Sequence, residues 1–207
     1  HGARVIKVSA SGGVMSHSTG PGAQQYSDEV LAAIADEAHR AGIRVAAHAI
    51  GDRAVRACIR AGIDCIEHGF LASDETLQMM ADHGTFLVST TCLTDAMDIE
   101  RAAPELRRKA AEVFPRARAM LPRAIAAGVR IACGTDAPAI PHGEGAKELA
   151  ALVARGMTPL QALRAATVTS AELVELDHEL GRLREGYLAD IIAVPGDPTR
   201  DITVTQD

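Results

Sequence analysis

Short apolar runs recur along the chain about every 20 residues, and this rhythm limits the fold more than any other feature. Amphipathic stretches separate the runs and carry helix signals, such as Ser27 followed by Asp28 and Glu29. Continuous apolar runs are typical of parallel strands that helices cover. We therefore expect an α/β fold with strands over residues 4–8, 44–47, 64–66, 85–89 and 129–133.

Helix signals fill the segments between these runs. One helix should follow Ser27 and end near Gly42, and another should run from Ser73 to about Gly84. A longer helical region over residues 104–127 should be interrupted at Pro115 and Pro122. Further helices are expected at residues 147–155 and 159–166, and a glycine-punctuated stretch then leads to an apolar strand at 191–194.

Composition excludes several classes of protein. The net charge of −6 and the lack of a basic run argue against nucleic-acid binding, and aromatics make up only 2% with no Trp, which leaves no stacking platform. No apolar stretch reaches the roughly 18–20 residues of a membrane helix. The sparse cysteines show no zinc spacing, so we expect reduced, mostly buried thiols at Cys58, Cys65, Cys92 and Cys133.

The chain begins at His1, and a strand pattern follows almost at once. No charged segment followed by an apolar stretch, the pattern of a signal peptide, is visible. We therefore expect this sequence to be part of a longer cytoplasmic protein.

Polar side chains with acid–base or metal-binding chemistry fall at the ends of four expected strands. They are Lys7, His48, His68 and Asp136. Each has an ordinary alternative: a strand-end histidine is often only hydrogen-bonded, an aspartate after Gly-Thr often caps a helix, and a lysine can simply pair with a carboxylate. In a parallel βα barrel, however, the carboxyl ends of the strands converge on one face, where active sites are built. The four together therefore predict a single site.

Two histidines lie in loops at the same expected face. His17 follows the glycine-rich segment Ser11–Ser16, and His142 lies in the segment Pro-His-Gly after the last barrel strand. We interpret both as candidate substrate-binding residues. The Gly12-Gly13 pair could hold an anion, but two glycines are a weak signal and a tight turn explains them better.

The segments VIKVSASGGVMS, VAAHAIGD, CIEHGF and CGTDAP resemble the second half of a metal-dependent amidohydrolase barrel, in the Xaa-Pro dipeptidase and imidazolonepropionase-like branch. TPLQALRAAT and GRLREGYLADIIAV resemble the segment in which that family leaves its barrel. The resemblance implies a partial (β/α)8 TIM-like barrel, comprising strands 4–8, over residues 1–180. It also implies that residues 181–207 begin the return into a small β-sandwich.

The resemblance further implies a metal centre and its chemistry. Lys7 matches the lysine that becomes carbamylated and bridges two metals, His48 and His68 match histidine ligands, and Asp136 matches the aspartate that binds one metal and shuttles the proton. The implied cofactors are two divalent ions, zinc by default with manganese or iron as alternatives. A metal-bound hydroxide would attack the scissile carbonyl. No other cofactor is expected.

One element of the family pattern is missing. Its first barrel strand carries a His-x-His pair, and no such pair occurs in this sequence. We therefore expect the chain to be inactive alone and to pair with a missing N-terminal half or with copies of itself. The lysine favours dipeptidase-like enzymes over imidazolonepropionase, so the expected substrate is a small peptide-like amide, without nucleic-acid or membrane partners.

Two alternatives remain open from the residues alone. A strand-end lysine such as Lys7 could instead form a Schiff base in a barrel aldolase, which would leave the histidines and Asp136 without a shared role. The chain could also be a non-catalytic half-barrel that assembles through its open sheet edges.

Overall fold

The structure is a computed structural model and describes residues 2–16, 20–97 and 99–206. Contacts divide the chain into two compact units. The first comprises His1–Ser89 and Asp98–Arg130, and the second comprises Thr90–Met97 and Ile131–Asp207.

The first unit is built on a parallel sheet. Its strands are β1 (Val5–Ser9), β2 (Arg44–Ala49), β3 (Cys65–His68) and β4 (Phe86–Val88), and each pairs in parallel with the next along the chain. The sheet order is β1-β2-β3-β4-β5, and the boundary between the units passes through β5 (Arg130–Ala132). The α/β prediction and all five expected barrel strands are confirmed, with bounds shifted by one or two residues.

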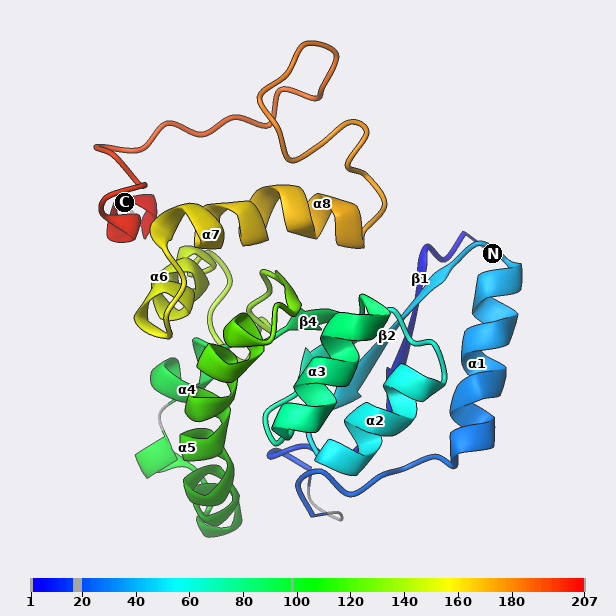
Figure 1. Cartoon of the computed structure of the whole chain (residues 1–207). Helices are drawn as coiled ribbons and strands as arrows, with labels where there is room; N and C mark the ends of the chain where they lie inside the picture. Colours follow the sequence, from blue (N-terminus) through cyan, green and yellow to red (C-terminus); the bar gives the residue numbers. More distant parts are fainter. Residues whose placement is uncertain (1, 17–19, 98, 207) are drawn as a thin grey trace. The chain divides into compact units, whose positions relative to one another are not determined.

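Helices α1 (Asp28–Arg40), α2 (Asp52–Arg60) and α3 (Asp74–His83) lie side by side across one face of this sheet (Figure 1). The predicted caps are present. The Ser27 hydroxyl accepts from the Val30 amide at the start of α1, and the Ser73 hydroxyl accepts from the Thr76 amide at the start of α3. At the end of α3, Gly84 has φ 68°, a left-handed conformation that suits glycine.

The prediction of interruptions at two prolines is wrong. After a short 3-10 turn, η1 (Ile99–Arg101), the single helix α5 runs unbroken over Pro104–Ala126 with Pro115 and Pro122 inside it. Both prolines lie on the exposed face, so the carbonyls that lose their amide partner can bind water instead. Burial of the opposite apolar face keeps the helix continuous.

The core of the first unit lies between the sheet and its helices. Val45, Ala47, Ile66 and Leu87 of the strands are fully buried, as are the helical residues Leu31, Val55, Leu77 and Met80.

The thiols of Cys58, Cys65 and Cys92 are buried, Cys133 is partly buried, and all four are free, as predicted.

The second unit is mainly helical. It contains α4 (Leu93–Ala96), α6 (Ala146–Ala154), α7 (Pro159–Arg164), the π-helical turn η2 (Ala165–Thr169), α8 (Ser170–Leu173) and the 3-10 segment η3 (Ile202–Gln206). Thr158 and Gln161 form a reciprocal capping box at the start of α7. Fully buried Glu148 of α6 accepts from the backbone amides of Thr91 and Cys92, both at 2.7 Å, and so fixes the segment that precedes α4.

The strand expected at residues 191–194 is not formed in the structure, and no other strand occurs among the residues described after β5. Ile191 is 64% exposed and Ile192 is 80% exposed. A strand requires a neighbouring strand for its backbone hydrogen bonds, and periodicity along the sequence cannot supply one.

Of the helices described, none is both long enough and apolar enough to cross a bilayer.

Candidate metal-binding and active site

Lys7 and His48 lie on the same face of the first unit's sheet. Lys7 pairs with Ala46 and Ser9 pairs with His48, and residues in register on parallel strands point to the same side. The alternate residues Val8 and Ala47 are buried on the opposite face. The apolar half of each strand therefore anchors it in the core, while Lys7 and His48 project from the less buried half.

His68 reaches His48 because the backbone leaves the strand conformation. As the last residue of β3 it pairs with Ala49, and a regular strand would place it opposite to His48. Its φ of 74° is in the left-handed region, a costly conformation for a residue with a side chain. The two imidazoles meet edge to face with ring centroids 4.6 Å apart, and Phe70 lies 5.3 Å from His68.

The surroundings of both histidines favour the neutral form of the ring. Burial lowers the pKa of His48, and the nearby charge of Lys7 lowers it further. Burial also lowers the pKa of His68 to about 3, with contributions from His48 and Lys7. A neutral imidazole has a free lone pair, which is what a metal ion requires of it. The charge of Lys7 thus lowers the pKa of both histidines.

Glu67 is a residue of this face that the sequence analysis missed. Its Oε2 lies 3.7 Å from Lys7 Nζ, and its Oε1 accepts a hydrogen bond from the Cys65 thiol at 3.2 Å. Glu67 pairs with His48 across the two strands. Strand alternation was the available signal, because it places the residue before His68 on the same side as Lys7.

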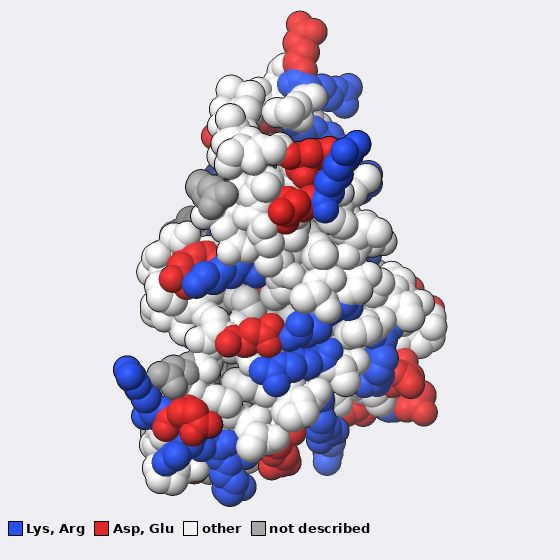
Figure 2. All heavy atoms as spheres, turned by 90° about the vertical axis from the view of Figure 1, so that its left-hand side faces the viewer, with Lys and Arg blue, Asp and Glu red and all other residues white. Residues whose placement is uncertain are grey.

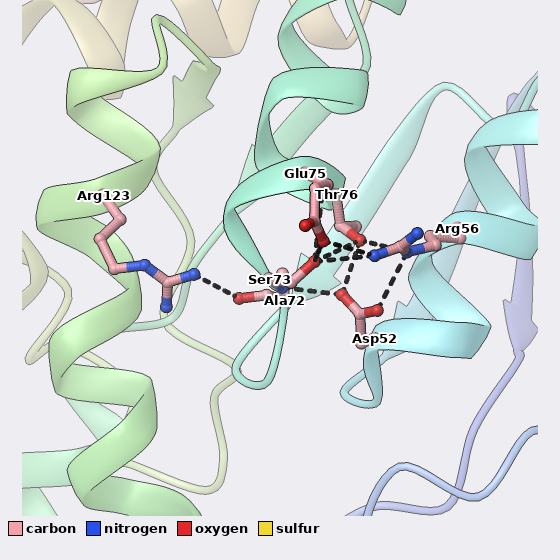
Figure 3. Close-up of polar contacts among 7 residues, drawn as sticks. All are labelled: Asp52, Arg56, Ala72, Ser73, Glu75, Thr76 and Arg123. Atoms are coloured by element: carbon pink, nitrogen blue, oxygen red, sulfur yellow. Dashed lines mark hydrogen bonds and ion pairs between the residues drawn. The ribbon is translucent and has the colours of Figure 1, made fainter.

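A polar network fixes the loop that follows His68 (Figure 3). Asp52, at the start of α2, accepts from the Ser73 amide at 2.7 Å, the Thr76 hydroxyl at 2.6 Å and Arg56 Nε at 3.0 Å. From α5, Arg123 donates to the carbonyl of Ala72 at 3.0 Å. The loop from His68 to Ser73 is thus tied to two helices at its far end.

This network also affects the charge of Asp52. Burial raises the pKa of Asp52, but hydrogen bonds from Thr76 and Ser73 and the charge of Arg56 outweigh burial, and the net pKa is lowered. Asp52 therefore holds the network as a carboxylate.

The remaining predicted residues lie in the second unit or outside the described chain. Asp136 follows β5 by four residues, is exposed, and has φ 57°, so it shares with His68 a strained backbone conformation. His142 is exposed in a turn before α6. His17 lies outside the residues that the structure describes. Of the predicted site residues, Lys7 and His48 thus share one face of the first unit's sheet, and the ring of His68 contacts that of His48.

The side chains on this face include donors that suit a divalent metal. Within the described ranges, no group of three or more His, Cys, Asp and Glu side chains is placed to hold a metal ion. His48 and His68 offer two ring nitrogens to such an ion, and Lys7 lies on the same face of the sheet as His48. Two neutral imidazoles and an oxygen donor such as a lysine carbamate suit zinc. The residues fit the metal that the family pattern implies.

Comparison with known proteins identifies the family of the chain. The family described as "Amidohydrolase family" matches residues 1–207. The chain belongs to the amidohydrolase family. Ochratoxinase of Aspergillus niger is 40% identical over 211 residues, which cover 100% of this chain and 44% of the relative.

Solved structures of the family share this fold. A Xaa-Pro dipeptidase with methionine bound in its active site matches with a TM-score of 0.95 and 35% identity, covering 100% of this chain and 52% of that one. The crystal structure of A. niger ochratoxinase matches with a TM-score of 0.89 and 40% identity, covering 100% of this chain and 48% of the other. The chain thus spans about half the length of these amidohydrolases.

Charges on the surface are mixed in sign. Figure 2 shows acidic and basic side chains interleaved on the face that it draws. Arg155 forms an ion pair with Asp95 at 2.6 Å, and Lys147 forms one with Glu144 at 2.6 Å. On that face, therefore, no continuous basic surface of the kind that binds nucleic acid is visible.

Proposed function

We propose that this chain supplies metal-binding and proton-transfer residues of a hydrolase that cleaves small peptide-like amides. The observation that carries the proposal is the pair of neutral imidazoles, His48 and His68, with Lys7 on the adjoining strand. Membership of the amidohydrolase family supports the same reaction class.

In this proposal the residues of the first unit hold the metal. His48 and His68 would supply nitrogen ligands. Lys7, converted to a carbamate by adding carbon dioxide and losing a proton, would supply oxygen ligands. A divalent ion bound there would lower the pKa of a water molecule and polarise the scissile carbonyl. We propose zinc, because imidazole and carboxylate-like oxygen donors suit it.

Asp136 carries the proton in this proposal. Its carboxylate takes a proton from the attacking water as the new carbon–oxygen bond forms. It then gives the proton to the amide nitrogen as the carbon–nitrogen bond breaks, so the products are a carboxylic acid and an amine. The exposed position of Asp136 after β5 and its strained φ support this role.

The substrate class follows from the relatives and stays a proposal for this chain. One similar structure is a Xaa-Pro dipeptidase, and another is an ochratoxinase. We propose an amide whose amine product carries a free carboxylate, as in a dipeptide.

Turnover by the full-length protein tests the proposal. Xaa-Pro and other dipeptides would be compared with the same dipeptides amidated at the C-terminus, before and after removal of metal with a chelator. We expect metal-dependent hydrolysis of the free dipeptides. Asp136→Asn should lower kcat by about 10²- to 10⁴-fold, whereas Asp82→Asn, on the surface of α3, should not. Metal-independent turnover, or a normal rate in Asp136→Asn, would contradict the mechanism.

The same protein distinguishes the hydrolase from a Schiff-base aldolase. Family membership favours the hydrolase. Borohydride treatment with a carbonyl substrate should leave Lys7 unmodified, and a reduced adduct on Lys7 would support the aldolase instead.

A further inference from the structure

The segment Ser11–Ser16 lies directly against the ring of His48. A Cβ built on Gly13 would come within 3.1 Å of His48 Cε1 and 3.2 Å of His48 Nε2. Real Cβ atoms rarely approach other atoms this closely. Gly13 therefore leaves the space that the imidazole occupies, and a Cβ at this position would require the ring or the Ser11–Ser16 segment to shift by a few tenths of an ångström.

Hydrogen bonds fix this segment to β2 at its beginning. The backbone carbonyl of His48 accepts from the amides of Ala10 at 2.9 Å and Ser11 at 3.3 Å. The Ser11 hydroxyl, which is buried, accepts from the Ile50 amide at 2.8 Å. Ala10 and Ser11, where the segment begins, are thus hydrogen-bonded to the backbone of His48 and Ile50.

The end of the segment is fixed from α5. The Gly13 amide donates to the Ser16 hydroxyl at 3.0 Å, and Lys109 Nζ donates to the Ser16 carbonyl. Lys109 also forms an ion pair with Glu105 one turn earlier on α5, at 2.7 Å. A continuous path of contacts therefore leads from Lys109 through Ser16 and Gly13 to the ring of His48.

Lys109 is an unusual residue to find at this place. It is only 3% exposed and lies on the apolar face of α5 beside Ala110 and Val113. Lysine is almost never fully buried unless it is paired, because its charge loses hydration. Apolar packing of α5 alone would be served as well by a methionine. Contacts with the Glu105 carboxylate and the Ser16 carbonyl compensate for part of this lost hydration, and a methionine would make neither contact.

We propose that Lys109 is a positioning residue for His48, which acts through the Ser11–Ser16 segment. Lys109 holds Ser16, Ser16 holds Gly13, and Gly13 sets the orientation of the imidazole. The inference rests on the proposed function only in treating His48 as a metal ligand. The positioning itself belongs to the metal-free chain.

The test compares Lys109→Met with Lys147→Met in the 207-residue chain. Lys147 is a half-exposed lysine of α6 paired with Glu144, so its replacement controls for loss of one positive charge. In the metal-free state, the ring Cε1–Hε1 signal of His48 in a ¹H–¹³C NMR spectrum should move in Lys109→Met and stay in place in Lys147→Met. The affinity for Zn²⁺, measured by calorimetry, should fall roughly 10- to 100-fold in Lys109→Met only, as for other residues that orient a ligand.

A second pair of variants covers a failure of Lys109→Met to fold. Gly13→Ala should move the same His48 signal, whereas Gly20→Ala should not, because a Cβ on Gly20 meets no atom within 4 Å. An unmoved His48 signal in folded Lys109→Met, or in Gly13→Ala, would overturn the inference. If the unaltered chain takes up no zinc while the signal still moves as expected, the proposed function fails and the positioning role stands.

Discussion

Replacement of Asp52 by asparagine is expected to destabilise the first unit by about 2–3 kcal/mol. The Asp52 carboxylate accepts three hydrogen bonds at 2.6–3.0 Å, from Ser73, Thr76 and Arg56. A hydrogen bond to a charged group contributes roughly 1.5–3 kcal/mol. Asparagine keeps one acceptor oxygen but presents an amide donor to Arg56. Because the Asp52 side chain is 33% exposed, water replaces part of what is lost, and we expect the cost of about one such bond.

Two measurements check this expectation. Urea denaturation followed by circular dichroism gives the change in the free energy of unfolding. Hydrogen–deuterium exchange should show faster exchange in the loop between His68 and Ser73 and in the first turn of α3. Asp36→Asn is the matched control, because Asp36 forms only an exposed pair with Arg40 on α1 and should cost less than about 0.5 kcal/mol. An equal, small cost in both variants would refute the assignment of Asp52 as the centre of this network.

The effect of Asp52 should also depend on pH. Because the folded-state pKa of Asp52 lies below its ordinary value near 3.8, its contribution is fully present above that value. It is lost as the pH falls through the folded-state pKa. The difference in stability between the unaltered chain and Asp52→Asn should therefore be constant from pH 7 to pH 5 and should shrink in stronger acid. A difference that grows in acid would have the wrong sign.

Three further predictions concern other parts of the chain. Leu121→Ala, on the buried face of α5, should cost about 2–5 kcal/mol in urea denaturation, and a cost below about 1 kcal/mol would show that this face is loosely packed. Glu148→Gln should cost about 1–3 kcal/mol, because an amide cannot accept equally well from both the Thr91 and Cys92 amides; unchanged protection of these amides in hydrogen exchange would contradict this. Alkylating reagents at neutral pH should label the native thiols slowly and the unfolded ones quickly, since burial raises the pKa of Cys58 and Cys133 to about 12; rapid native labelling would argue against the burial described.

The sequence was sufficient for the elements whose signals are local. Ser27, Ser73 and Gly84 mark helix ends by their own hydrogen bonds or backbone angles, so the predicted helices begin and end where expected. The 20-residue rhythm likewise predicts the order of the parallel strands, because each strand pairs with the next along the chain. Because β1 pairs with β2, this strand order also places Lys7 and His48 on neighbouring strands.

Other features depend on contacts that the sequence does not specify. Pro115 and Pro122 predict a break in the helix, but the effect of a proline depends on whether it faces water or the core. The segment 191–194 has the pattern of a strand, yet a strand forms only beside another strand.

Parts of the candidate site were equally out of reach. The left-handed φ of His68, which turns its ring toward His48, has no signal in the residue type. Glu67 lies in register with His48, so strand alternation could have predicted its place, whereas Lys109 is a buried residue of α5 whose role depends on contacts distant in sequence.

The central claim is that Lys7, His48 and His68 form one metal site. Titration of the chain with Zn²⁺, followed by ¹H–¹³C NMR of the histidine rings, tests it most directly. The account predicts that the His48 and His68 signals change together at a fixed stoichiometry while those of His39, His83, His142 and His178 stay in place, and that Lys7→Ala weakens the response. Zinc that leaves the His48 and His68 signals unmoved, or that moves only the other histidines, would contradict the claim.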